Sequence, residues 1–299
     1  MGITTVATSE GVNIGCPEDG KYAFYNSPYT AHRLTTGIDI YPAAEFGETT
    51  PSPVAGEINL VRRVKCPKGR GFKDPGYDVV TVLKSSENPL MAIKLLHIDP
   101  VVGPGDTVER GQELGRLLRS GYFGAGTSPH IHVEIRNNFD PLRVRGGHPI
   151  KRVHDIGHST PPEKLVGIVT RSKPEFSIIK LDGVAACGLP ADVGGTSGIL
   201  DGGIPYYGWM GAHFCEAPPD GEAIKLAGFP IADIVALTEN TCLAECRDFK
   251  VKVDNTEILG LSLRISPINE PEVKLIPYGL GSLRLGQGDE VTITIEEAG

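Results

Sequence analysis

SPHIHVEI, at residues 128–135, carries the strongest local signal in this sequence of 299 residues. Alternate side chains of a β-strand point to the same face, so His130, His132 and Glu134 share one face and the apolar residues between them share the other. Two imidazoles on a rigid strand can put one on a metal ion and the other beside the metal-bound water. Taken alone, two polar residues on a solvated sheet face explain the pattern equally well.

Two segments earlier in the chain add residues of the same chemistry. Asp39 lies in the apolar, strand-like run of residues 37–41, where an unpaired carboxylate is costly, so a cation or a hydrogen-bond donor is expected beside it. His97 lies near the end of another apolar run, residues 91–98. Each residue alone can be a hydrogen-bonded structural side chain. In this order and with this glycine punctuation, we interpret them as parts of one metal-dependent site.

The order of these residues resembles the M23 (lysostaphin/LytM-like) family of metallopeptidases. That family has a His and an Asp ligand before a strand, a His-Leu at a strand end, a Gly-rich segment and then His-x-His-x-Glu. The resemblance covers about residues 22–145 and leaves the second half of the chain unexplained. The matching segments here are residues 32–39, 51–58, 97–98, 108–115, 126–135 and 139–142.

The resemblance implies a zinc peptidase that acts on a peptide or polypeptide substrate. By position, His32, Asp39 and His132 are the implied zinc (Zn2+) ligands, and His97 and His130 are the implied catalytic imidazoles. Zinc-activated water would attack the peptide carbonyl, while one imidazole takes the proton and the other stabilises the oxyanion or assists the leaving amine.

Glu134 leaves two interpretations open. It lies on the same strand face as His132, where it can orient an imidazole as a hydrogen-bond partner. The same position also suits an ordinary solvated carboxylate on a strand.

One spacing departs from the family pattern. Six residues separate His32 from Asp39, where the family usually has three, and the residue four before Asp39 is Thr35, a poor zinc ligand. Either residues 33–36 form a turn that brings His32 back to the metal, or this ligand is lost. In the second case the domain is a catalytically inactive M23-like binding or regulatory module.

Composition restricts the other classes of function. The net charge is −8 and we find no block of lysine and arginine, so neither a nucleic acid nor an anionic membrane is expected as a partner. No apolar stretch approaches the ~20 residues that span a bilayer, and the N-terminus lacks the pattern of a signal peptide. We therefore expect a cytoplasmic protein with no membrane span, while the sequence leaves the oligomeric state open.

The fold class is expected to be mainly β. Glycine (38) and proline (24) are abundant, and short strand-like runs alternate with turn signals. We predict an irregular N-terminal arm over residues 1–21, an antiparallel M23-like peptidase core over 22–145, a linker over 146–164 and a second β-rich domain over 165–299. In the last, residues 259–265 and 291–295 alternate as half-buried strands do.

Overall fold

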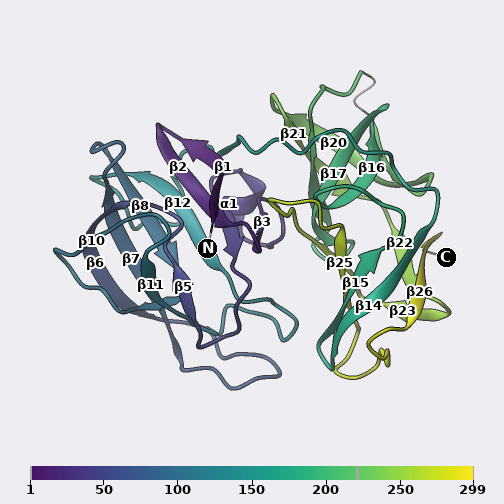
Figure 1. The fold of residues 1–299 in the computed structure, drawn as a ribbon, viewed down its shortest axis with the longest axis horizontal. Coiled ribbons are helices and arrows are strands. Elements are labelled where there is room, and N and C mark those ends of the chain that lie inside the picture. Colours follow the sequence, from purple (N-terminus) through teal and green to yellow (C-terminus); the bar gives the residue numbers. More distant parts are fainter. Residues whose placement is uncertain (1, 220–221, 299) are drawn as a thin grey trace. The chain divides into compact units, whose positions relative to one another are not determined.

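The computed structural model describes residues 2–219 and 222–298, and nearly all of its regular secondary structure is β-strand (Figure 1). The chain forms two compact units. The N-terminal unit comprises Met1–Tyr22 and Tyr29–His154, and the C-terminal unit comprises Ala23–Pro28 and Asp155–Gly299. The predicted mainly β architecture, with a second β-rich domain, is confirmed.

Three sheets make up the described part of the N-terminal unit, and the pairings from β10 to β4 in the largest of them are antiparallel. The seven-stranded sheet has the order β10 (Thr107–Val108), β6 (Gly56–Lys65), β7 (Tyr77–Ser85), β8 (Met91–Leu96), β12 (Ile131–Asn137), β4 (Ile38–Tyr41) and β3 (Lys21–Ala23). A three-stranded sheet consists of β13 (Lys151–Arg152), β1 (Ile3–Ser9) and β2 (Val12–Pro17). The other consists of β5 (Thr49–Pro51), β11 (Glu113–Leu117) and β9 (Ile98–Pro100).

The predicted irregular arm is wrong for residues 3–17. This segment is the β1–β2 hairpin, whose two-residue turn places Glu10 and Gly11 at φ 51° and 77°. Such left-handed turns match the twist of the flanking strands and favour glycine. The hairpin is stable because Val6, Val12 and Ile14 are buried. The sequence signal was a run of β-branched residues on both sides of Glu-Gly.

The predicted linker over 146–164 also differs from the structure. Its first part belongs to the N-terminal unit, because β13 pairs with β1 through Ala7↔Arg152. The backbone N–H of His148 donates to the carbonyl of Ile135 at 2.9 Å, and Ile150 is buried. Two strand residues and one buried isoleucine gave too short an apolar pattern to be recognised as part of a sheet.

The described part of the C-terminal unit is one antiparallel system of thirteen strands. Its order is β16 (Leu189–Val193), β19 (Ala223–Leu226), β20 (Phe229–Leu237), β21 (Thr241–Cys246), β18 (Trp209–Phe214), β17 (Thr196–Ile204), β24 (Gly260–Leu263), β25 (Glu272–Ile276), β15 (Phe176–Leu181), β14 (Leu165–Lys173), β26 (Glu290–Glu297), β22 (Phe249–Val253) and β23 (Thr256–Ile258). Because β16 also pairs with β17, the strands from β16 to β17 close into a ring around buried Leu200, Met210 and Phe214. The strands predicted over 259–265 and 291–295 are present as β24 and β26.

A short segment of the first half of the sequence is part of the C-terminal unit. The backbone N–H groups of Phe24 and Tyr25 both donate to Oδ2 of Asp201 on β17, at 2.6 and 3.3 Å. His213 on β18 contacts the same oxygen at 3.1 Å through Nε2. The hydroxyls of Tyr25 and Thr241 lie 3.0 Å apart. Residues 23–28 therefore supply hydrogen bonds to a domain that otherwise begins at residue 155.

Helix is almost absent from the described residues, where α1 (Thr30–Arg33) is a single turn. Within residues 2–219 and 222–298, no helix has the length and apolar character that crossing a membrane requires.

Candidate metal centre

Three buried side chains of the N-terminal unit converge on one point. Nδ1 of His132 lies 2.9 Å from Oδ1 of Asp39, and Nε2 of His32 lies 3.3 Å from the same oxygen. The two imidazole nitrogens are 3.1 Å apart. One donor atom from each residue lies within 4.8 Å of the others, which is the arrangement expected of three ligands to one ion. These are the three residues that the sequence analysis named as ligands.

The sheet explains how two of the donors meet. Asp39 on β4 and His132 on β12 are directly opposite in the antiparallel pairing, so their side chains share one face. Gly37 allows the close approach, because an added Cβ there would lie 2.6 Å from Cε1 of His132.

The helical turn α1 brings in the third donor. His32 lies on α1, and the backbone N–H of Thr36 donates to the carbonyl of Ala31 at 2.8 Å. Thr35 closes the turn with φ 54°, in the left-handed region. The extra residues between His32 and Asp39 are thus taken up by the end of α1 and its turn, and His32 lies beside Asp39.

The second nitrogen of His132 contacts Glu134. The distance from Nε2 to Oε1 is 3.3 Å, and the same carboxylate pairs with Lys94 and Arg136 at 2.8 Å each. Glu134 is buried, so it is not a solvated strand residue. Burial raises the pKa of Glu134, but His132 and Lys94 outweigh burial and bring it down to about 2. A carboxylate behind an imidazole in this way fixes the orientation and tautomer of a metal ligand.

His130 lies next to the three donors without being one of them. Its Nε2 is 3.6 Å from Oδ2 of Asp39, and its Nδ1–H donates to the carbonyl of Ser128 at 2.9 Å. Tyr41 lies against it, with ring centroids 4.9 Å apart, and donates its hydroxyl to Asp39 Oδ2 at 3.4 Å.

His97 is held by a carboxylate that the sequence analysis missed. Its Nδ1 lies 2.6 Å from Oδ2 of Asp78, and its backbone N–H donates to Oδ1 of Asp78 at 3.1 Å. His97 has φ 70°, an uncommon conformation for a non-glycine residue, and its carbonyl accepts from the N–H of Leu118 at 2.9 Å. The rings of His97 and His130 are 5.2 Å apart.

A sequence signal for Asp78 did exist. It is an acidic residue in the strand-like run of residues 77–83, the same situation that drew attention to Asp39. Only the pairing of β7 with β8, which places Val80 opposite Leu96, brings it beside His97. Burial raises the pKa of Asp78, but the His97 imidazole outweighs burial and lowers it.

The two histidines of the SPHIHVEI strand have pKa values shifted in opposite directions. Burial lowers the pKa of His130 to about 4, despite the neighbouring Asp39. Burial also acts on His132, but hydrogen bonds to Asp39 and Glu134 outweigh it and raise its pKa to about 9. Burial raises the pKa of Asp39, yet the surrounding imidazoles of His130, His32 and His132 hold it well below its usual range. At neutral pH, His130 is therefore neutral and His132 is protonated.

Aromatic rings line the other side of the two imidazoles. The ring of Phe123 lies 4.6 Å from His97 and 4.8 Å from His130, centroid to centroid, and Phe46 packs on Phe123 at 5.6 Å. Such rings limit the access of water to the two imidazoles.

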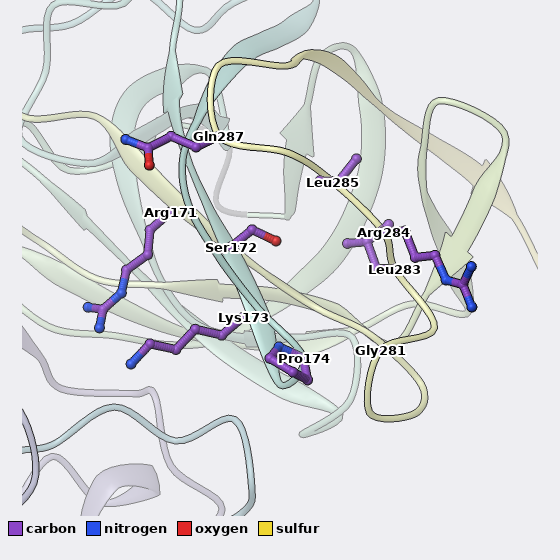
Figure 2. Close-up of a pocket in the computed structure, with 9 residues that line it drawn as sticks. All are labelled: Arg171, Ser172, Lys173, Pro174, Gly281, Leu283, Arg284, Leu285 and Gln287. Carbon is purple, nitrogen blue, oxygen red and sulfur yellow. The ribbon is translucent and has the colours of Figure 1, made fainter.

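The C-terminal unit contains a separate cavity of about 600 Å³. Figure 2 shows the side chains of Arg171 and Lys173 extending on one side of their strand and Arg284 on the other, so the three cations do not converge. Its lining residues are Arg171, Ser172, Lys173, Pro174, Gly281, Leu283, Arg284, Leu285 and Gln287. The converging donors at His32, Asp39 and His132 are therefore the better candidate site.

Solved structures similar to the chain include those of lysostaphin and Helicobacter pylori Csd3. One is the NMR solution structure of lysostaphin, at 15% identity over 77% of this chain and 95% of that chain, with a TM-score of 0.29. The other is Helicobacter pylori Csd3 from a hexagonal crystal, at 18% identity over 50% of this chain and 41% of that chain, with a TM-score of 0.25. Values this low carry no argument about the site, whose interpretation rests on its own geometry.

A search of the curated proteins found no match. Family models do match, and they do so in both halves of the chain. Residues 15–152 match the N-terminal domain, and residues 167–296 the C-terminal domain, of the domain of unknown function DUF8155. The two matches follow one another in the order of their names and together span most of the chain, which therefore belongs to the DUF8155 family.

Proposed function

We propose that the N-terminal unit is a zinc-dependent peptidase of the M23 type that hydrolyses a peptide bond in a polypeptide. The observation that carries this proposal is the convergence of His32, Asp39 and His132, with the imidazoles of His97 and His130 beside them. Two nitrogens and one carboxylate oxygen form a donor set that suits zinc, and three protein ligands leave a position open for water.

The chain's own residues divide the remaining work. A bound zinc ion supplies Lewis-acid polarisation of water and of the peptide carbonyl. His130 holds its Nδ1 proton on the Ser128 carbonyl, which leaves Nε2 as the nitrogen that accepts a proton from water. His97 holds its Nδ1 proton on Asp78, which leaves Nε2 for the developing oxyanion or the leaving amine.

The position of His32 favours the enzyme over the inactive module. The inactive module is expected only if His32 cannot reach the metal. However, Nε2 of His32 lies 3.3 Å from Oδ1 of Asp39 and 3.1 Å from Nδ1 of His132. Glu134 also favours the enzyme, because a metal-ligating imidazole commonly has a carboxylate in contact with its other ring nitrogen, as Glu134 contacts Nε2 of His132.

Zinc analysis with a His32→Ala variant tests the ligand set. We expect about one zinc per wild-type chain and a zinc affinity at least ~100-fold lower in the variant. Removing a ligand should lower the zinc affinity at least as much as removing a residue that only hydrogen-bonds to a ligand. His148→Ala is a matched control, since that imidazole contacts Asn137 and Glu10 instead. Equal zinc affinity in wild type and His32→Ala overturns the ligand assignment.

Incubation of the zinc-loaded full chain with a peptide library tests the activity itself. We expect zinc-dependent cleavage that a chelator stops and added zinc restores. Stoichiometric zinc without any cleavage, from a library that includes bacterial wall peptides, overturns the peptidase and leaves the binding module.

The Asp78→Asn variant tests how His97 is positioned. We expect zinc binding to stay at the wild-type level and kcat to fall about 10- to 100-fold, because the amide no longer holds the His97 ring in one tautomer. Asp78→Glu, which keeps the carboxylate, should recover part of the loss, and the pH profile of kcat should shift in the Asn variant. A loss of zinc, or an unchanged kcat and pH profile, contradicts the positioning role.

A further inference from the structure

Six exposed cationic side chains lie at the end of the β6–β7 hairpin where the connecting loop joins the two strands: Arg62, Arg63, Lys65, Lys68, Arg70 and Lys73. We call residues 62–73 the basic hairpin end. The sequence analysis found no block of lysine and arginine because glycine, proline and apolar residues interrupt the run after Arg62 and Arg63. The concentration stands out in a chain whose net charge is −8.

Salt bridges do not neutralise these charges: over residues 2–219 and 222–298, no ion pair within 4.0 Å joins any of the six to a carboxylate. The acidic residue in the connecting loop, Asp74, accepts the backbone N–H groups of Gly69 and Gly76, which lower its pKa together with the charge of Lys68. Arg63 lies over the ring of Tyr77 at 4.6 Å and keeps its charge. Several like charges held together without partners favour an anionic ligand.

One cation of the basic hairpin end, Arg62, lies on the same sheet face as the candidate metal centre, whereas Arg63 and Lys65 alternate to the opposite face and the other three lie in the connecting loop. Successive cross-strand partners run from Asp39 through His132, Leu96 and Val80 to Arg62. Directly opposite residues share a face, so these five side chains form one row across the sheet. With strands ~4.8 Å apart, Arg62 lies roughly 19 Å from Asp39.

Apolar residues form the floor between the two ends of this row. Val80, Val82 and Ala92 cluster there, with Leu60 and Leu96 partly buried against them. The floor is therefore apolar in its middle, holds the metal donors at one end and is cationic at the other.

A loop connects the basic hairpin end with the catalytic imidazoles from the side. The N–H of Gly121 donates to Sγ of Cys66 at 3.4 Å, and the guanidinium of Arg119 lies 4.1 Å from the ring centroid of Phe72. Two residues after Gly121, Phe123 packs on the two imidazoles. The position of the basic hairpin end relative to the site is thus fixed by packed residues.

We propose that the substrate is an acidic polypeptide, which lies across the strands from the candidate metal centre to the basic hairpin end. This inference rests on the proposed function and names its substrate class. An extended chain advances ~3.3 Å per residue, so the acidic residues are expected about six residues from the bond that is cleaved. A nucleic acid is the less favoured anion, because Arg62 lies in the same cross-strand row as the residues of the proposed peptidase site.

Fluorescence anisotropy of labelled peptides tests this inference on the full chain. Peptides of about twelve residues share one neutral half, and the other half carries glutamates or the isosteric glutamines. A chelator is present, so that no peptide is hydrolysed. We expect the glutamate peptide to bind about 10-fold more tightly at about 50 mM salt, and the difference to shrink at about 500 mM salt.

A charge-matched pair of variants locates the effect. Lys68→Gln/Arg70→Gln/Lys73→Gln, which removes three of the six positive charges, should remove most of the preference for the glutamate peptide. Lys164→Gln/Lys180→Gln/Lys225→Gln changes the net charge equally, but in the C-terminal unit, and should retain the preference. Equal affinity for both peptides, or an equal loss in both variants, overturns the inference. So does a single-stranded oligonucleotide that binds more tightly than the glutamate peptide through the same three residues.

The outcome separates this inference from the peptidase proposal. A glutamate preference that the first variant removes, in a protein that cleaves no peptide, supports the acidic ligand and overturns the peptidase. Cleavage that ignores the charge of the peptide supports the peptidase and overturns the acidic substrate.

Discussion

A His130→Ala variant is expected to lose peptide hydrolysis by about 10²- to 10⁴-fold in kcat while it still binds one zinc ion. The reason is its position: Nε2 lies 3.6 Å from Asp39 Oδ2, beside the three donors, and burial keeps the ring neutral with a pKa of about 4. A neutral imidazole can take a proton at pH 7, and alanine cannot. Steady-state kinetics on a cleaved library peptide, with zinc analysis of the same samples, measure both quantities.

Two comparisons sharpen that experiment. His148→Ala removes an imidazole of the same unit that lies away from the donors, so its kcat should match the wild type. His32→Ala should lose zinc and activity together, whereas His130→Ala should lose activity alone. If His130→Ala releases the metal, His130 is a ligand and the assignment of roles within the SPHIHVEI strand is wrong. If it keeps its activity, another group accepts the proton.

The strand pattern predicted much of this site because the information was local. The spacing of His130, His132 and Glu134 determines which face each side chain takes, and the strand is present as β12. Asp39 was recognisable because a carboxylate in an apolar run needs a partner.

Other features depended on pairing that no short window of sequence contains. Asp78 acquires its role only because β7 pairs with β8 and brings it to His97. The contact of His32 with Asp39 depends on a one-turn helix and a left-handed Thr35, which the ligand spacing could not distinguish from a lost ligand.

The segment of residues 23–28 shows the same limit at the level of domains. Nothing in its composition distinguishes it from the strands around it, so the sequence analysis placed it in the N-terminal domain. Its assignment depends on Asp201, about 180 residues later, whose carboxylate accepts the backbone N–H groups of Phe24 and Tyr25. A buried acceptor of this kind can be recognised only when both ends of the hydrogen bond are known.

Replacing Asp201 by alanine is expected to lower the free energy of unfolding of the C-terminal unit by about 3–5 kcal/mol. Asp201 is fully buried, and its Oδ2 serves the N–H groups of Phe24 and Tyr25 and the imidazole of His213. Alanine leaves these donors buried without their acceptor, and each unsatisfied group costs about 1–3 kcal/mol. Asp201→Asn keeps one oxygen and should lose less.

The single tryptophan makes this measurable within the full chain. Trp209 lies on β18 of the C-terminal unit, is 7% exposed and packs edge-on against Tyr25 at 6.4 Å, so its fluorescence during urea unfolding follows that unit. Asp233→Ala is the matched control, because that exposed carboxylate pairs with Arg247 on the surface and its loss should cost less than about 1 kcal/mol. Equal midpoints for Asp201→Ala and Asp233→Ala would mean that residues 23–28 are not held by Asp201. Zinc affinity reports on the N-terminal unit and should stay at the wild-type value, because the lost hydrogen bonds all belong to the other unit.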